Sequence, residues 1–440
     1  MINLFRVAYF LGLANRRLYW SGEKLKRFQD ERIRRVVRFA NSSVPFYHRF
    51  FREHGVDIDE IRGIDDLSKL PINSKEVFKN QKSREIVSSE YNLDELKKVR
   101  TSGSSGKPFE IYLDSREDAW RKAIYMRANI SCGQKLRDKW VVMTSPHHFN
   151  DTSGIQNRLG VYAQSCISLF ESTDNKLKQI AGINPDILDG YSGSLVLLAK
   201  EIKRKGFEGI NPKLMFGSAE SVDLKSRRFM EEVFDAPFCD QYGAAEVDRS
   251  AWQCLEREGY HMDVDSIITE FVDKNGEPVA NGEKGEVVFT SLFNFAMPFI
   301  RYGIGDIGVP CDDECSCGRT FPLMKGIEGR KDSFLALPGN RVMSPMVFNF
   351  AFSDFKYYND LNQYRVRQRK IDLFEVIIEM GRNLVKEEEV EAEFKRHIRN
   401  YIDFDEGELR FDVSFVKEMP KLSTGKLMSV TSDVKTHVVG

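Results

Sequence analysis

The sequence predicts an α/β fold in which a large N-terminal domain of several subdomains precedes a small α+β domain. Its 440 residues exceed the length of one typical domain. Short apolar runs alternate with helical stretches up to about residue 330, which is typical of layered helices and strands. The pattern changes after Gly329-Arg330-Lys331-Asp332. We therefore expect one domain at residues 1–330 and a second domain at residues 331–440.

The first part of the large domain is expected to be mostly helical. Over residues 1–95 the clearest signal is an apolar stripe at helical spacing among arginines, made by Ile33, Val36, Val37 and Ala40. Asn73 or Ser74 followed by Glu76 resembles a capping box, which predicts a helix that begins at this point.

The remaining elements follow from shorter patterns. Strands are predicted in the large domain at residues 109–114, 140–144, 213–216 and 286–290. A helix is predicted from Ser115. In the small domain, strands are predicted at residues 364–369, 373–378 and 410–416, and a charged amphipathic helix at residues 386–398.

Composition excludes several classes of protein. Hydrophobic residues make up 41% and charged residues 30%, as in soluble globular proteins. The net charge is −1, whereas a nucleic-acid-binding protein is usually strongly basic. No apolar run reaches the roughly 18 residues of a membrane span. Seven cysteines, an odd number, favour reduced thiols or a metal site, and hence a cytoplasmic protein, over a disulfide framework.

The first 17 residues are apolar but are interrupted by Arg6, and no small-residue cleavage site follows. An amphipathic helix therefore explains them better than a signal peptide. Its apolar face would pack on the core, or on a second copy of the chain in a homodimer.

A loop rich in glycine and serine is the most informative stretch. It runs through Thr101, Ser102, Gly103, Ser104, Ser105, Gly106 and Lys107 to Pro108. Glycines let backbone N–H groups converge on an anion, and the lysine adds a positive charge for phosphate oxygens. The usual NTPase P-loop is excluded, because only two residues separate the glycines and proline follows the lysine. The alternative is a flexible turn before a strand.

Further stretches carry residues with polar chemistry. They are Phe216-Gly-Ser-Ala-Glu220, Gln241-Tyr-Gly-Ala-Ala-Glu246, Arg301-Tyr-Gly-Ile-Gly-Asp306 and Lys421-Leu-Ser-Thr-Gly-Lys426. Each has a structural alternative, because Asp306 could cap a turn, Glu246 could begin a helix and Lys426 could simply be solvated.

Taken in order, TSGSSGKP, FGSAE, YGAAE, RYGIGD, GRKD and STGK resemble the motif set of the acyl-adenylate-forming superfamily. That superfamily includes acyl-CoA synthetases, luciferases and nonribosomal-peptide adenylation domains. The stretches RVVRFANSSVPFYHRFFREHGVD and NPDILDGYSGSLVLLAKEI look like its phenylacetate–CoA ligase-like branch, which has members associated with capsular polysaccharide synthesis.

The resemblance implies an ATP-dependent ligase with a large adenylation domain and a small mobile C-terminal domain. Such an enzyme converts a carboxylate and ATP into acyl-AMP and pyrophosphate, and then passes the acyl group to coenzyme A. One alternative is a carboxylate–amine ligase in surface or capsular polysaccharide biosynthesis. Another is a non-catalytic nucleotide-binding protein on the same fold.

The resemblance also implies roles for single residues. Glu246 would hold Mg²⁺, and Lys426, from the small domain, would act with Lys107 on the reacting groups. Asp332 would be the hinge. The implied ATP- or AMP-binding residues are Thr101, Ser102, Gly103, Ser104, Ser105, Gly106, Ser218, Ala219, Glu220, Gln241, Tyr242, Gly243, Asp306 and Arg330. The implied acyl pocket contains His147, His148 and Tyr191, although exposed loop histidines are an equal alternative.

Four residues have the composition of a zinc site. Cys254-x6-His261 and Cys315-x-Cys317 together supply three sulfurs and one imidazole, a closed tetrahedral set that is typical of structural Zn²⁺. Cys311 is a spare candidate. Some members of the branch carry a similar pair of clusters. The alternative is thiols without a metal and a surface histidine.

Overall fold

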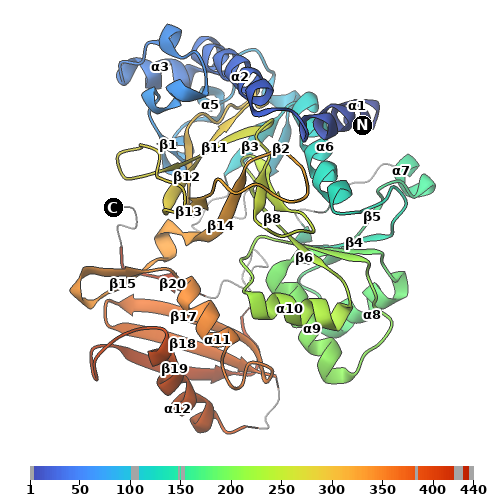
Figure 1. Cartoon of the computed structure of the whole chain (residues 1–440), viewed down its shortest axis with the longest axis vertical. Helices are drawn as coiled ribbons and strands as arrows, with labels where there is room; N and C mark the ends of the chain where they lie inside the picture. Colours follow the sequence, from blue (N-terminus) through green and yellow to red (C-terminus); the bar gives the residue numbers. More distant parts are fainter. Residues whose placement is uncertain are drawn as a thin grey trace. The chain divides into compact units, whose positions relative to one another are not determined.

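The structure is a computed structural model that describes residues 4–100, 109–146, 149, 154–381, 385–420 and 430–435 (Figure 1). The chain forms two compact units. The first unit comprises residues 1–133 and 241–327, and the second unit comprises residues 134–240 and 328–438. The predicted domain boundary near residue 330 remains a prediction.

Helices dominate the beginning of the first unit, as expected. They are α1 (Leu4–Arg17), α2 (Gly22–Ser43), α3 (Pro45–Glu53), α4 (Lys75–Lys79), α5 (Ser83–Ile86) and α6 (Ser115–Ser131). The predicted stripe of α2 is fully buried. The Asp114 side chain accepts hydrogen bonds from the backbone N–H groups of Arg116 and Glu117, which explains where α6 begins. Within the described residues, no helix has both the length and the apolar character that a bilayer crossing demands.

The helix predicted near Ser74 is present as α4, but the predicted capping box does not form. Ser74 precedes α4, but its side chain makes no capping hydrogen bond. Asn73 instead belongs to the short strand β1 (Asn73–Ser74), and its side-chain amide donates to the carbonyl of Ile300 at 2.6 Å. Pairing of β1 with another strand therefore sets the backbone here, and this tertiary contact overrides the local capping pattern.

Most strands of the first unit form one sheet. They are β9 (Asp248–Gln253), β10 (Tyr260–Met262), β11 (Ile267–Val272), β12 (Gly285–Ser291), β13 (Tyr302–Pro310) and β14 (Leu323–Arg330). The order is β11-β12-β13-β14-β10-β9, and β9 pairs with the second half of β8 (Phe238–Ala244). β1 adds to β13 in parallel. A separate antiparallel pair is formed by β2 (Lys97–Arg100) and β3 (Glu110–Leu113).

The second unit contains a parallel sheet. Its strands are β4 (Trp140–Thr144), β5 (Gln164–Ser168), β6 (Ile187–Tyr191), β7 (Leu214–Ser218) and the first half of β8, in the order β5-β4-β6-β7-β8. The helices α7 (Gly154–Leu159), α8 (Thr173–Ile183), α9 (Ser192–Lys205) and α10 (Leu224–Phe234) alternate with the strands. Every residue of β6 is buried, as expected for a strand covered on both faces. Figure 1 shows α8, α9 and α10 beside these strands.

A smaller sheet in the second unit confirms the predicted α+β segment. Its strands are β17 (Leu361–Lys370), β18 (Leu373–Met380), β19 (Arg410–Val416) and β20 (Val430–Ser432), in the order β19-β18-β17-β20. The pair β15 (Leu335–Leu337) and β16 (Arg341–Met343) and the helices α11 (Met346–Ser353) and α12 (Glu387–His397) accompany it. Phe348, Phe374, Phe394 and Phe411 are among the residues of its buried core.

A partly buried lysine, Lys200, joins α9 to the segment that leads into β17. The Lys200 ammonium donates to the carbonyls of Tyr358 and Leu361 at 3.0 and 2.8 Å. The hydroxyl of Tyr358 in turn hydrogen-bonds Ser226 at 2.7 Å. Burial lowers the pKa of Lys200 to about 7, and the carboxylates of Asp223 and Asp360 only partly oppose this effect.

This lysine predicts a pH-dependent stability. Between pH 7 and the unfolded pKa of about 10.4, the unfolded chain binds more protons at Lys200 than the folded chain does, so the free energy of unfolding rises with pH. Relative to Lys200→Met, the wild type should gain about 2 kcal/mol between about pH 7.5 and 9. Urea unfolding at both pH values measures the gain. Lys203→Met, at an exposed position of the same helix, is the control. If the difference in the free energy of unfolding between wild type and Lys200→Met did not change with pH, the lowered pKa of Lys200 would be contradicted.

Candidate nucleotide site and metal centre

Tyr242 and Asp306 come together in the first unit, although 64 positions separate them. The Tyr242 hydroxyl donates to Asp306 Oδ2 at 2.8 Å. Gly243 follows Tyr242 at a bulge between β8 and β9, where a Cβ atom would lie 2.2 Å from the carbonyl oxygen of Asp248. Asp306 lies in a bulge of β13, next to Gly305 with a φ of +81°. Two bulges therefore aim these side chains at one place.

Glu246 belongs to the same unit and is almost completely buried. Its Oε1 atom lies 3.1 Å from the Lys75 ammonium and accepts a hydrogen bond from the Tyr302 hydroxyl at 3.3 Å. The Arg121 guanidinium donates to its backbone carbonyl at 2.7 Å. Burial and the neighbouring Glu246 carboxylate raise the pKa of Tyr302, so this hydroxyl remains a donor. A carboxylate oxygen is the kind of ligand that Mg²⁺ prefers.

The second unit holds the predicted Ser218-Ala219-Glu220 stretch at the C-terminal end of β7. Ala219 has a φ of +70°, an uncommon conformation for a residue with a side chain. The Glu220 carboxylate accepts a hydrogen bond from the backbone N–H of Gly193 at 3.0 Å, which ties this turn to the start of α9. The carboxyl ends of parallel strands are the usual ligand side of such sheets.

Other predicted residues of the second unit are placed as follows. Tyr191 ends β6 and is buried, which raises the pKa of its hydroxyl. Arg330 and Asp332 are exposed and interact at 3.4 Å. Gln241, which belongs to the first unit, is buried and donates to the Asn129 side chain at 3.0 Å. The predicted residues that lie outside the described part of the chain are Thr101, Ser102, Gly103, Ser104, Ser105, Gly106, Lys107, His147, His148 and Lys426.

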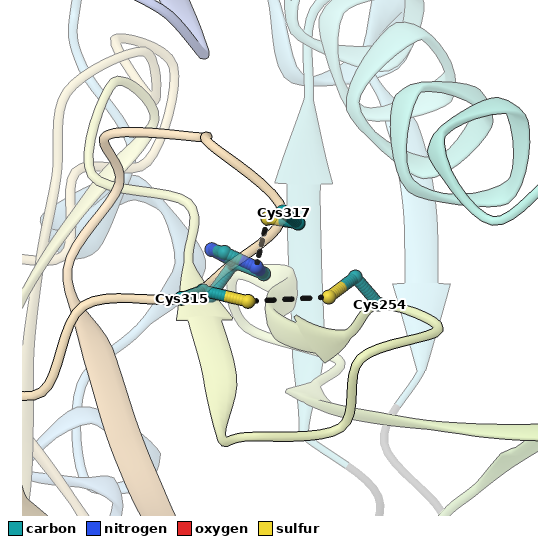
Figure 2. A group of neighbouring side chains, drawn as sticks. Cys254, Cys315 and Cys317 are labelled. Atoms are coloured by element: carbon teal, nitrogen blue, oxygen red, sulfur yellow. Dashed lines mark hydrogen bonds between the residues drawn. The ribbon is translucent and has the colours of Figure 1, made fainter.

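The predicted metal ligands gather in the first unit. One ligand atom from each of Cys254, His261, Cys315 and Cys317 lies within 4.8 Å of the others. Figure 2 shows the sulfurs of Cys254 and Cys315 pointing toward one another, with Cys317 on a neighbouring stretch of loop. Cys311 is buried, but among the described residues it is not part of this group.

Two distances in this Cys3His cluster are close to those of a tetrahedral site. The sulfurs of Cys254 and Cys315 are 3.5 Å apart, and the Cys317 sulfur lies 3.4 Å from His261 Nε2. Tetrahedral Zn²⁺ with its usual bond lengths requires about 3.8 Å between sulfurs and about 3.6 Å between sulfur and nitrogen. A disulfide would need about 2.05 Å. No disulfide joins any of the seven cysteines, all of which lie in the described ranges.

Local structure explains how the cluster forms. Cys254 directly follows β9, and His261 lies on β10, which pairs with both β9 and β14. The loop that precedes β14 supplies the other two cysteines. Burial lowers the pKa of His261 to about 4, so its imidazole is neutral near pH 7 and can act as a ligand. Burial opposes ionisation of Cys317, but hydrogen bonds from Arg319 outweigh it and lower the pKa of this thiol.

Comparisons with known proteins agree with this geometry. No model of a known protein family matches the chain. Phenylacetate–coenzyme A ligase of Thermus thermophilus is 26% identical over 393 residues, which cover 85% of this chain and 87% of the relative. The Pseudomonas putida enzyme of the same name is 26% identical over 403 residues, covering 87% and 89%.

Among solved structures, 2-hydroxyisobutyryl-CoA ligase in complex with 2-HIB-AMP superposes with a TM-score of 0.78 at 19% identity, covering 95% of this chain and 91% of that one. This match confirms the predicted fold class. The chain is an enzyme whose sequence and fold are similar to those of adenylate-forming acid–CoA ligases. Among these it is similar to the phenylacetate–CoA ligases.

The structure adds residues that the superfamily motifs did not single out. Lys75, Tyr302 and Arg121 all contact Glu246. Glu258 accepts two hydrogen bonds from Ser316, at 2.7 Å from the backbone N–H and 3.0 Å from the hydroxyl, and so fastens the two halves of the Cys3His cluster. Tyr302 lies inside the quoted motif RYGIGD, so its position was a usable signal. The other three carry no local signal.

Proposed function

We propose that this enzyme uses ATP to convert a carboxylic acid into acyl-AMP and pyrophosphate, and then passes the acyl group to coenzyme A. One observation carries the proposal: Tyr242 and Asp306, from two separate motifs, are hydrogen-bonded in the same unit. Similarity over most of the chain to ligases named for phenylacetate and coenzyme A supports it. Relatives of known structure bind 2-HIB-AMP together with CoA, or ATP.

The candidate site residues of the first unit have the following roles in this reaction. Asp306 accepts hydrogen bonds from the ribose hydroxyls of ATP, and Tyr242 holds the Asp306 carboxylate in place while offering its ring to the adenine. Glu246 holds Mg²⁺, which would reduce the repulsion between the carboxylate substrate and the triphosphate. The loop from Thr101 to Lys107 binds the outer phosphates.

The second unit supplies the remaining groups. By their motif resemblance, Ser218, Ala219 and Glu220 would line the adenine. Tyr191, with His147 and His148, borders the acid. Arg330 binds near the ribose and phosphate. Residues 331–440 act as a lid that turns about Asp332 and brings Lys426 to the reacting oxygens.

The Cys3His cluster holds a structural Zn²⁺. Its four ligands leave no open position for a substrate, and three of them are buried. The ion therefore clamps the hairpin of β9 and β10 to the loop before β14 and takes no part in the chemistry. The strands β9, β10 and β14 belong to the sheet that carries Tyr242 and Asp306.

Pyrophosphate exchange tests the proposed function. A panel of aromatic and short aliphatic carboxylates is incubated with the enzyme, ATP and labelled pyrophosphate, and at least one acid should produce labelled ATP. Consumption of that acyl-AMP with coenzyme A, compared with amines, then identifies the acceptor. Acceptance of amines alone would favour the alternative of an amide-forming ligase in capsular polysaccharide synthesis. No exchange with any acid, together with no ATP binding, would contradict adenylation.

Asp306→Asn provides the matched test of the site. Loss of a charged hydrogen-bond acceptor costs about 1.5–3 kcal/mol, so the KM for ATP should rise roughly 10- to 100-fold. The control is Asp312→Asn, which removes an exposed carboxylate a few residues further on and should leave the KM unchanged. Equal KM values for both variants would remove Asp306 from the ribose site.

A further inference from the structure

Lys75 is the first residue of α4 and is held firmly against β13. The preceding residues pair with that strand in parallel, Asn73 opposite Tyr302 and Ser74 opposite Gly303. The backbone N–H of Asn73 donates to the carbonyl of Arg301 at 2.9 Å. β13 also carries Asp306, so Lys75 directly follows a strand, β1, that pairs with the strand of the proposed ribose site.

The lysine side chain reaches a carboxylate that solvent scarcely touches. Its ammonium lies 3.1 Å from Glu246 Oε1, and the two side chains are 27% and 4% exposed. A buried carboxylate without a partner costs several kcal/mol, and a nearby cation offsets that cost. Lys75 supplies that cation from a position with access to solvent, where its long side chain can still move.

Mg²⁺ and an ammonium compete for the same oxygen of Glu246. A divalent cation bound there would repel Lys75, and the strongest acceptors brought in with the metal are the phosphate oxygens of ATP. A lysine is a compact point charge with three donors, and phosphates bind such a group well. The leaving pyrophosphate gains negative charge during adenylation, and a cation beside it stabilises this charge.

We propose that Lys75 is a further nucleotide-binding residue: it balances Glu246 in the metal-free enzyme and binds the pyrophosphate portion of ATP when Mg²⁺ occupies Glu246. This inference rests on the proposed function. It assigns Lys75 a contact with the phosphates beyond the α-phosphate and none with the adenosine.

Nucleotide binding without metal measures the contact of Lys75 with the phosphates separately from the contribution of Mg²⁺. In EDTA, calorimetric titration compares Glu246→Gln with the double variant Glu246→Gln/Lys75→Met, in which no buried carboxylate is left without a partner. The double variant should bind ATP about tenfold more weakly, the equivalent of one charged hydrogen bond, and should bind AMP equally well. Glu246→Gln/Lys75→Arg, which keeps the charge, should recover most of the affinity for ATP.

A second titration uses Mg–ATP with wild type, Lys75→Met and the control Lys26→Met. Lys26 forms an exposed ion pair with Asp65 at 2.6 Å, so its loss removes the same charge without touching the site. Lys75→Met should lose about tenfold in affinity and Lys26→Met none. Equal ATP affinities with and without Lys75, or a parallel loss for AMP, would overturn the inference. Failure of the wild type to bind ATP at all would instead overturn the proposed function.

Discussion

Replacing Cys315 with serine is expected to release the proposed zinc ion and to unfold the first unit near room temperature. The wild type should contain about one zinc per chain, and structural zinc sites contribute on the order of 10 kcal/mol to folding. That contribution is comparable with the whole stability of a typical domain, about 5–15 kcal/mol. Elemental analysis of the purified protein and thermal unfolding followed by circular dichroism measure the two effects.

Cys311→Ser is the matched control for the zinc experiment. Cys311 is a buried thiol four residues before Cys315 but outside the Cys3His cluster, so its loss should leave the zinc content unchanged. Treating the wild type with a strong chelator should reproduce the instability of Cys315→Ser, and added Zn²⁺ should reverse it. A wild type that contains no zinc, or a Cys315→Ser variant that keeps it, would show that the cluster is a set of thiols without a metal.

Arg127→Met is expected to destabilise the first unit by about 3–5 kcal/mol. The Arg127 guanidinium contacts Asp265 at 2.9 Å and Asp263 at 2.5 Å, and all three side chains are completely buried. The substitution leaves two carboxylates without their main cation in a region that excludes water. Thermal unfolding should show a midpoint lowered by on the order of 10 °C.

The control for Arg127 is an ion pair on the surface of the same unit. Arg38 contacts Asp59 at 3.3 Å, and both side chains are mostly exposed. Arg38→Met should therefore change the free energy of unfolding by less than about 0.5 kcal/mol. If Arg127→Met proved as mild as Arg38→Met, the buried cluster would contribute little to stability.

Prediction from sequence succeeded where the signal is local. The strands β18 and β19 and the helix α12 have strong periodic patterns, and the structure confirms them within two residues at each end. The Cys3His cluster was predictable because its four ligands fall in two short stretches, and the hairpin of β9 and β10 brings the first two together.

Prediction failed where distant segments determine the outcome. The helix α4 was predicted, but the capping box of Asn73 or Ser74 with Glu76 does not form, because Asn73 pairs with a strand more than 220 positions away. The partnership of Lys75 with Glu246 has the same origin, since only the pairing of β1 with β13 brings the lysine to the carboxylate. No periodicity or spacing in either segment encodes such a contact.

The pairing of β1 with β13 also has a consequence for biosynthesis. The first unit consists of two stretches separated by residues 134–240. The strand β13, which pairs with β1, ends only at residue 310. A ribosome that adds about 5–20 residues per second needs roughly 5–20 s to translate the intervening hundred or so residues. During that interval the early helices and Asn73 have no access to the strands of residues 241–327, which are not yet synthesised. Nascent chains should therefore expose apolar surface that invites chaperones, and synonymous codons that slow translation between β3 and β8 should lower the soluble yield.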